Sequence, residues 1–187
     1  KPDIKLDKKN KHVFSSIGIP LEKLRNKILE LSNQNLFYPV NPTSRNDAFV
    51  GGTLSCNASG FIPGEKGATR YWVKEIEFLL PNGNYLSIKR GQYISLNSEF
   101  ILKDENNIIK LPMPTYKRPN IKNASGPFSN DIGEIDLIDL IIGSEGIFGM
   151  IVSCKLNLLD RPKRYLDLFI KLESENQAID LYHHLYS

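Results

Sequence analysis

Apolar and polar positions recur along this chain with two periods, one typical of helices and the other of strands. Leu21, Leu24, Ile28 and Leu31 follow Pro20 at helical spacing with charged residues between them, which predicts an amphipathic helix. Shorter segments alternate with period two or form apolar runs. They predict strands at residues 12–19, 71–80, 85–89, 150–159 and 165–172.

Turn-forming residues connect several of these segments. Asn82-Gly83 lies between two predicted strands and indicates a β-hairpin. Residues 100–111 predict a second pair of strands around a turn at 104–107. A short helix is expected at residues 133–142, with Asp136 and Asp139 supplying favourable negative charge near its N-terminus, and another helix is expected after Ser174 as its N-cap.

This order of elements predicts an α+β fold, with a mainly antiparallel sheet flanked by helices. The proline break at Pro162 separates residues 1–162 from a last strand and helix. We therefore expect one main domain at 1–162 and the beginning of a second domain at 163–187.

Composition excludes several classes of partner. The 187 residues hold 24 basic and 21 acidic side chains, a net charge of +3, and the lysine-rich first eleven residues have no interleaved aromatic residues, so a nucleic-acid interface is not expected. No apolar run is long enough to span a bilayer. Cys56 and Cys154 form neither a disulfide framework nor a metal-ligand pattern, and we expect a cytoplasmic protein, either free or peripheral to the membrane.

Two glycine-rich segments about ninety residues apart carry the chemical signal. The first glycine segment is Val50-Gly51-Gly52-Thr53-Leu54-Ser55-Cys56-Asn57-Ala58-Ser59-Gly60, and the second is Gly143-Ser144-Glu145-Gly146-Ile147-Phe148-Gly149-Met150-Ile151. Glycine permits positive φ angles and lets a large ligand lie directly on the backbone. Amide groups in such turns donate to anionic or carbonyl oxygens. We interpret the segments as two walls of a cofactor pocket; the alternative is a pair of structural turns without a ligand.

The ordered set of motifs resembles the FAD-linked oxidases of the vanillyl-alcohol-oxidase and p-cresol-methylhydroxylase type. It consists of the first glycine segment, Lys66-Gly67-Ala68-Thr69-Arg70-Tyr71-Trp72-Val73, Leu80-Pro81-Asn82-Gly83 and the second glycine segment. The chain is most similar in character to the D-lactate dehydrogenase and glycolate oxidase branch and to alkyldihydroxyacetonephosphate synthase. The resemblance implies that residues 1–162 are the second subdomain of an FAD-binding domain, that a pyrophosphate-binding loop is missing upstream, and that 163–187 begin a substrate or cap domain.

The resemblance also implies which residues contact FAD. These are Pro42, Thr43, Ser44, Gly51, Gly52, Thr53, Ser55, Cys56, Asn57, Ala58, Ser59, Gly60, Gly67, Thr69, Gly143, Glu145, Gly146, Gly149, Met150 and Ile151. Two departures from the family pattern concern the environment of the flavin ring: Lys66 stands where the family often has Tyr, and Ile147-Phe148 stand where it often has Thr-Leu.

No catalytic set can be assembled from the remaining polar residues. Arg70 could reach a substrate carboxylate or form a structural ion pair. Cys56 is expected to be a small buried packing residue, Trp72 and Phe78 are expected in the core, and His12, His183 and His184 on the surface. No metal site is expected, and the absence of a catalytic set is consistent with a flavin that performs the chemistry itself.

We therefore expect the FAD-binding portion of an oxidoreductase that transfers a hydride to FAD from a 2-hydroxy acid or a related alcohol. The alternatives are chemistry like that of alkyldihydroxyacetonephosphate synthase, a sugar-linked flavoenzyme, and a non-catalytic structural module. We expect a small-molecule substrate, whereas the sequence specifies neither the electron acceptor nor the oligomeric state.

Overall fold

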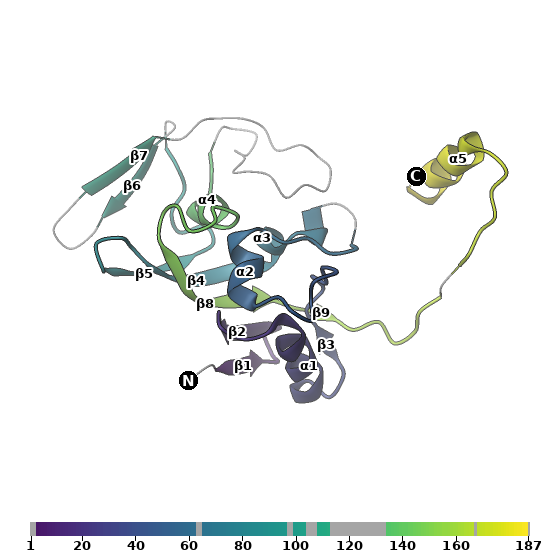
Figure 1. Cartoon of the computed structure of the whole chain (residues 1–187), viewed down its shortest axis with the longest axis horizontal. Helices are drawn as coiled ribbons and strands as arrows, with labels where there is room; N and C mark the ends of the chain where they lie inside the picture. The colour runs from purple at the N-terminus through teal and green to yellow at the C-terminus, as the bar shows by residue number, and fades with distance from the viewer. Residues whose placement is uncertain are drawn as a thin grey trace.

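A five-stranded antiparallel sheet forms the centre of the protein in the computed structural model, which describes residues 3–62, 65–96, 99–103, 108–112, 134–166 and 168–186. The sheet has the strand order β1-β2-β8-β4-β5 (Figure 1). Its strands are β1 (Ile4–Asp7), β2 (His12–Ser16), β4 (Val73–Leu79), β5 (Tyr85–Lys89) and β8 (Met150–Asn157).

The strand register gives the sheet one apolar face and one polar face. Val13 lies opposite Leu156, and Cys154 lies opposite both Ser15 and Ile76, so these buried side chains point to the core. On the other face, Lys5, Phe14, Lys155, Glu75 and Lys89 form one row across all five strands. The Nζ of Lys155 lies 2.6 Å from Oε2 of Glu75 in this row.

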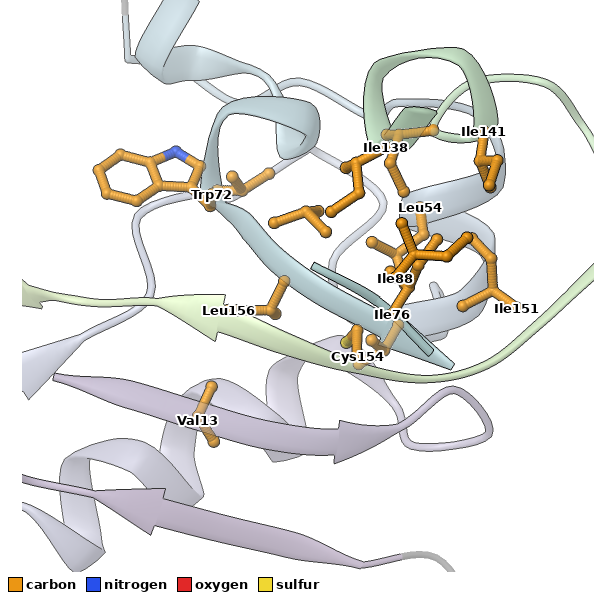
Figure 2. Close-up of a cluster of buried hydrophobic side chains, with 14 of the residues drawn as sticks. Val13, Leu54, Trp72, Ile76, Ile88, Ile138, Ile141, Ile151, Cys154 and Leu156 are labelled. Carbon is orange, nitrogen blue, oxygen red and sulfur yellow. The ribbon is translucent and has the colours of Figure 1, made fainter. Parts of the chain in front are cut away.

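Helices cover the apolar face. Helix α2 (Val50–Ser55) packs against β2 and β8, and α4 (Leu137–Ile141) packs against β4 and β5. Figure 2 shows Leu54 of α2 with Ile138 and Ile141 of α4 above Ile76 and Ile88 of the sheet. Helix α1 (Leu21–Leu31) contacts β1 and β3 (Leu36–Phe37) through its buried leucine and isoleucine face, and β3 pairs with β9 (Leu159–Asp160).

Further local structures lie outside the five-stranded sheet in the described part of the chain. The predicted strand pair at 100–111 is confirmed as β6 (Glu99–Lys103) and β7 (Ile108–Pro112), although the turn at 104–107 lies outside the described residues. A single 3-10 turn, η1 (Glu65–Gly67), leads into α3 (Thr69–Trp72), whose side chains Thr69, Arg70 and Trp72 are buried.

Most predicted elements are confirmed, with corrected boundaries. The strand expected at 71–80 begins at Val73 because α3 occupies the residues before it. The helix expected at 133–142 is Leu137–Ile141, because the Asp136 side chain caps it by accepting a hydrogen bond from the Ile138 N–H at 2.9 Å; residue 133 lies outside the described residues. The strand expected at 12–19 ends at Ser16.

The prediction of a strand at 165–172 is wrong for the residues that the structure describes. The segment has strand-like alternation but no partner strand, and its side chains Tyr165, Leu166, Leu168 and Phe169 are exposed. Beyond it, α5 (Glu175–Tyr186) begins after Ser174, whose Oγ accepts a hydrogen bond from the Gln177 N–H at 3.3 Å. Figure 1 shows α5 at the end of an extended stretch, away from the sheet.

Candidate functional site

The first glycine segment begins as a helix rather than as the expected turn. The N–H groups of Val50 and Gly51 donate to the carbonyls of Ile19 and Ile17, both at 2.9 Å, so they tie α2 to the end of β2. The resemblance implies that Thr53 contacts FAD. Its Oγ1 instead donates to the Val50 carbonyl at 2.8 Å and is buried.

The second half of this segment turns inward. Asn57 is fully buried with φ 47°, and its side-chain oxygen accepts a hydrogen bond from the backbone N–H of Arg70 at 2.8 Å. Gly60 N–H donates to the Gly67 carbonyl at 2.8 Å. A Cβ on Gly60 would lie 2.5 Å from the backbone nitrogen of Asn41, so glycine is required there by packing.

The second glycine segment has the backbone expected of a ligand-binding turn. Gly143, Glu145, Gly146 and Gly149 all have positive φ, at 89°, 53°, 84° and 144°. Glutamate adopts the left-handed region rarely, and such residues persist where the surrounding structure holds them. The N–H groups of Gly143 and Glu145 donate to the carbonyls of Leu54 and Ser55, both at 3.0 Å. The structure therefore brings the two glycine segments side by side.

An open groove of about 830 Å³ lies between the two segments, at the end of the sheet. Eight of the residues predicted to contact a cofactor line it: Gly51, Gly52, Ser55, Glu145, Gly146, Gly149, Met150 and Ile151. The remaining predicted residues lie outside its lining: Pro42, Thr43, Ser44, Thr53, Cys56, Asn57, Ala58, Ser59, Gly60, Gly67, Thr69 and Gly143.

Part of the lining lies outside the residues that the resemblance implies contact FAD. The groove is also bounded by Ile17, Gly18, Phe49, Phe78, Leu79, Leu80, Pro81, Gly83, Ile141, Ser144 and Ile147. Most of these residues come from the segment after β2, from the end of β4 and the hairpin turn after it, and from α4. Phe49 precedes α2, and Ser144 and Ile147 belong to the second glycine segment. The Asn82-Gly83 pair predicts the hairpin turn from the local sequence. No local pattern predicts that this turn lies beside the second glycine segment.

Arg70 is held inside the protein. Its side chain is 5% exposed, and its Nη2 donates to the Ile142 carbonyl at 2.6 Å. Burial of the guanidinium against the main chain favours a structural role for Arg70 over the alternative of contact with a substrate carboxylate. Beside it, the Thr69 hydroxyl donates to the Ala58 carbonyl at 2.7 Å.

The prediction for Cys56 is wrong, whereas those for the aromatic residues are confirmed. Cys56 follows α2 as its C-cap residue and is exposed, because the helix ends there and only the next residue turns inward. Trp72 and Phe78 are buried, at 3% and 2% exposure. His183 and His184 are exposed on α5, and His12 is partly exposed.

The groove is apolar and nearly free of charge. Glu145 is the only charged residue among those lining it in the described part of the chain. Phe49, Ile147 and Met150 line it although they are 52%, 79% and 55% exposed. Large apolar side chains gathered around a hollow are typical of a surface that a ligand or partner covers.

Ionisable side chains cluster at the start of α4, outside the lining of the groove. Arg90 donates from Nη1 to Oδ1 of Asp139 at 3.0 Å, and Asp136 accepts a hydrogen bond from the Gly91 N–H at 2.6 Å. Burial raises the pKa of the Asp136 carboxyl above its ordinary value, against the lowering effect of these hydrogen bonds. In the described residues, no group of three or more His, Cys, Asp or Glu side chains could hold a metal ion.

Comparison with known proteins agrees with this geometry. Residues 3–89 match the family described as an FAD binding domain. The chain is 30% identical over 145 residues to a D-2-hydroxyglutarate dehydrogenase of Xanthomonas citri pv. viticola, a match that covers 78% of this chain and 22% of that protein. It is 28% identical over 173 residues to a D-lactate dehydrogenase of Anaerostipes hadrus, covering 92% of this chain and 28% of that protein.

A glycolate oxidase subunit of Bacillus subtilis is 23% identical over 155 residues, with 81% of this chain and 25% of the subunit covered. Among solved structures, alkyldihydroxyacetonephosphate synthase aligns with a TM-score of 0.52 at 15% identity, over 87% of this chain and 22% of that one, which supports the fold. The chain thus spans about a quarter of the length of its curated relatives. The family resemblance predicted from the glycine motifs is confirmed.

Proposed function

We propose that this chain, which belongs with the FAD-linked oxidases of the vanillyl-alcohol-oxidase and p-cresol-methylhydroxylase type, forms one side of the FAD site of an oxidoreductase. The substrate that we propose is a 2-hydroxy acid or a related alcohol that loses a hydride from the carbon next to its hydroxyl. The names of three relatives, a D-2-hydroxyglutarate dehydrogenase, a D-lactate dehydrogenase and a glycolate oxidase subunit, support this substrate class.

The observation that carries the proposal is the bare backbone inside the groove. A Cβ placed on Gly18 or Gly52 would have no atom within 4 Å, so the backbone of both residues faces open space. Gly52 is also exposed within a helix, where glycine stabilises nothing locally. A flat ring system can lie against such a surface, and the groove volume is within the range of sites for small molecules and cofactors.

The charge of the groove indicates which part of FAD would bind there. The lining contains Glu145 but no Lys or Arg among the described residues. A pyrophosphate is stabilised by cations or by clusters of amide donors, so the groove suits the uncharged ring systems better than the phosphates. We propose that the phosphates are held by the pyrophosphate loop expected upstream of this chain.

The chain itself would bind and orient the cofactor. We propose that Gly51, Gly52 and Ser55 contact it from one side, and that Gly146, Gly149, Met150 and Ile151 contact it from the other. Phe49 and Ile147 would exclude water from the bound ring. When bound, FAD supplies the hydride acceptor, so this part of the chain needs no acid, base or nucleophile of its own.

The other residues predicted to contact FAD do not line the groove, and we propose two roles for them. Thr53, Asn57, Gly60 and Thr69 hold the first glycine segment in shape, and Gly143 holds the second against it. We propose that Pro42, Thr43, Ser44, Cys56, Ala58, Ser59 and Gly67 reach the cofactor only through parts of it that extend beyond the groove.

The C-terminal residues support a second domain. The described residues between 161 and 185 are exposed apart from Leu181, and they include Tyr165, Leu166, Leu168 and Phe169. Apolar side chains of this kind need a core to pack against. We propose that 163–187 begin a substrate or cap domain, as the resemblance implies.

We infer a small-molecule substrate and a cytoplasmic location. The two cysteines of the chain are free, which is consistent with a reducing compartment. No described helix is long and apolar enough to cross a bilayer. The electron acceptor and the oligomeric state would be set by the whole protein.

The test is the visible absorption spectrum of the full-length protein, desalted and then incubated with FAD. A retained flavin spectrum that bleaches anaerobically on addition of D-lactate or D-2-hydroxyglutarate is expected. Bound flavin that no D-2-hydroxy acid bleaches would move the search to other substrates and to non-redox chemistry of the alkyldihydroxyacetonephosphate synthase kind. A full-length protein that retains no flavin would refute the cofactor site and favour a structural module.

A further inference from the structure

Arg70 lies between the first glycine segment and the residue that precedes the second. Its backbone N–H donates to the Asn57 side chain at 2.8 Å, and its Nη2 donates to the Ile142 carbonyl at 2.6 Å. Asn57 belongs to the first glycine segment and follows Cys56, the C-cap residue of α2, whereas Ile142 directly precedes Gly143. One buried residue therefore bonds both to the first glycine segment and to the residue that precedes the second.

The backbone around Arg70 is shaped to accept its guanidinium. A Cβ on Gly143 would lie 3.0 Å from Nη2 of Arg70 and 3.1 Å from Cβ of Asn57, and Gly143 has φ +89°. A side chain at this position would press on the guanidinium and on Asn57 together. The glycine at 143 is therefore explained by the Arg70 contact as well as by its own backbone conformation.

Two main-chain hydrogen bonds between the glycine segments depend on the distance between Arg70 and Ile142. Gly143 N–H donates to Leu54 O and Glu145 N–H donates to Ser55 O, both at 3.0 Å. Gly143 and Glu145 flank Ser144, and the residues that follow line the groove. A shift of Ile142 away from Arg70 would lengthen these bonds and move the second glycine segment.

A second arginine, Arg90, donates a hydrogen bond to the main chain of Arg70. Arg90 Nη2 donates to the Arg70 carbonyl at 2.9 Å, and Arg90 Nε donates to the Val73 carbonyl at 2.9 Å. The same guanidinium reaches Asp139 of α4 from Nη1 at 3.0 Å. The helix that leads into Ile142 is thus fixed to the strand that follows Arg70.

We propose that Arg70 is a positioning residue that sets the spacing of the two glycine segments and thereby the affinity for FAD. The proposal rests on the function proposed above. Arg70 is not among the residues that line the groove, so we propose that it acts through the Asn57 and Ile142 contacts rather than on the cofactor directly. A planar guanidinium can satisfy several carbonyl acceptors in a fixed geometry, whereas a lysine offers one flexible ammonium group.

The experiment uses the full-length protein with Arg70→Met and Arg70→Lys. Ile28→Val and Ile28→Ala serve as controls, because Ile28 is fully buried on α1 and does not line the groove. Three quantities are measured for each variant: the melting temperature without FAD, the hydrogen exchange rates of the Gly143 and Glu145 amides without FAD, and the Kd for FAD.

For Arg70→Met we expect exchange at both amides to be at least tenfold faster, and the Kd for FAD to rise at least tenfold above that of an Ile28 variant with the same melting temperature. For Arg70→Lys we expect an amide exchange rate and a Kd for FAD that lie between those of the wild-type protein and those of Arg70→Met. Unchanged exchange at Gly143 and Glu145, or a Kd that follows melting temperature along the line of the Ile28 variants, would overturn the proposal. If Arg70→Met does not fold, Arg70→Lys alone is compared with the same controls.

Failure of the proposed function gives a different result. If the wild-type protein binds no FAD, the effect of Arg70 on affinity is refuted together with the FAD site. Faster exchange in the Arg70 variants would then still establish the structural link between the segments, because that measurement needs no cofactor.

Discussion

Gly149 lies so close to Leu79 that a Cβ built on it would stand 2.4 Å from the Leu79 carbonyl oxygen and 2.8 Å from the Phe78 ring. This contact brings the end of the second glycine segment against the end of β4, where Leu79 pairs with Met150. The backbone of Gly149 also has φ 144°. Two independent constraints therefore require glycine here.

We expect Gly149→Ala to lower the free energy of unfolding by about 2–4 kcal/mol, because overpacking adds to backbone strain. Gly91→Ala is the control, since Gly91 has φ +82° but open space around its Cβ position. That variant should lose only about 1 kcal/mol. Urea denaturation measures both, and equal losses would show that the contact with Leu79 is unimportant.

At Gly52 we expect alanine to have the opposite effect on stability. Its Cβ position is open and its backbone is helical, so Gly52→Ala should leave stability unchanged or raise it by up to about 1 kcal/mol. Gly52→Leu should fill the groove and raise the Kd for FAD at least tenfold, a loss of about 1.4 kcal/mol. Asn26→Ala on the exposed side of α1 is the control. Tight FAD binding by Gly52→Leu would place the cofactor elsewhere.

The two cysteines should differ in reactivity. Cys154 is buried in β8, and burial raises the pKa of its thiol to about 12, so almost no thiolate forms at pH 8. Cys56 is exposed. Iodoacetamide at pH 8 should alkylate Cys56 in the native protein and both cysteines after unfolding in urea, as read by peptide mass spectrometry. Native labelling of Cys154 would contradict its position in the core.

His12 provides a pH-dependent prediction. Burial and the nearby Lys74, whose Nζ lies 3.1 Å from Nε2 of His12, lower the pKa of His12 below its ordinary value. The unfolded chain therefore binds the proton first as the pH falls through about 6.5, and the His12 contribution to stability decreases below that pH. Lys74→Met should raise the His12 pKa in an NMR titration. Lys110→Met in β7 should leave it unchanged, and a similar shift in both variants would exclude a local effect of Lys74.

Local patterns were sufficient to predict several elements. The spacing of Leu21, Leu24 and Ile28 predicted α1, and Asn82-Gly83 predicted the hairpin of β4 and β5. The order of the central sheet could not be predicted in this way. Strand β8 lies between β2 and β4, and pairing between such distant residues leaves no local pattern in the sequence.

The candidate site divides in the same manner. Glycine motifs identified both sides of the groove, since positive φ and bare backbone are local requirements. Ile17, Phe78 and Pro81 line it because the ends of β2 and β4 meet there, which depends on the sheet. Asn57 is among the residues that the resemblance implies contact FAD, but the turn after α2 directs its side chain into the interior.

The central place of β8 has a consequence for the synthesis of this protein. On the ribosome, the hairpins of β1 with β2 and of β4 with β5 emerge first, and the edges of β2 and β4 that β8 later pairs have no partner at that stage. Both edges are paired only when Met150–Asn157 has left the exit tunnel. Nascent chains arrested before residue 150 should therefore associate with chaperones or aggregate, and chains extended well past residue 157 should not. The strand that completes the groove is thus also the one that ends the exposure of the growing chain.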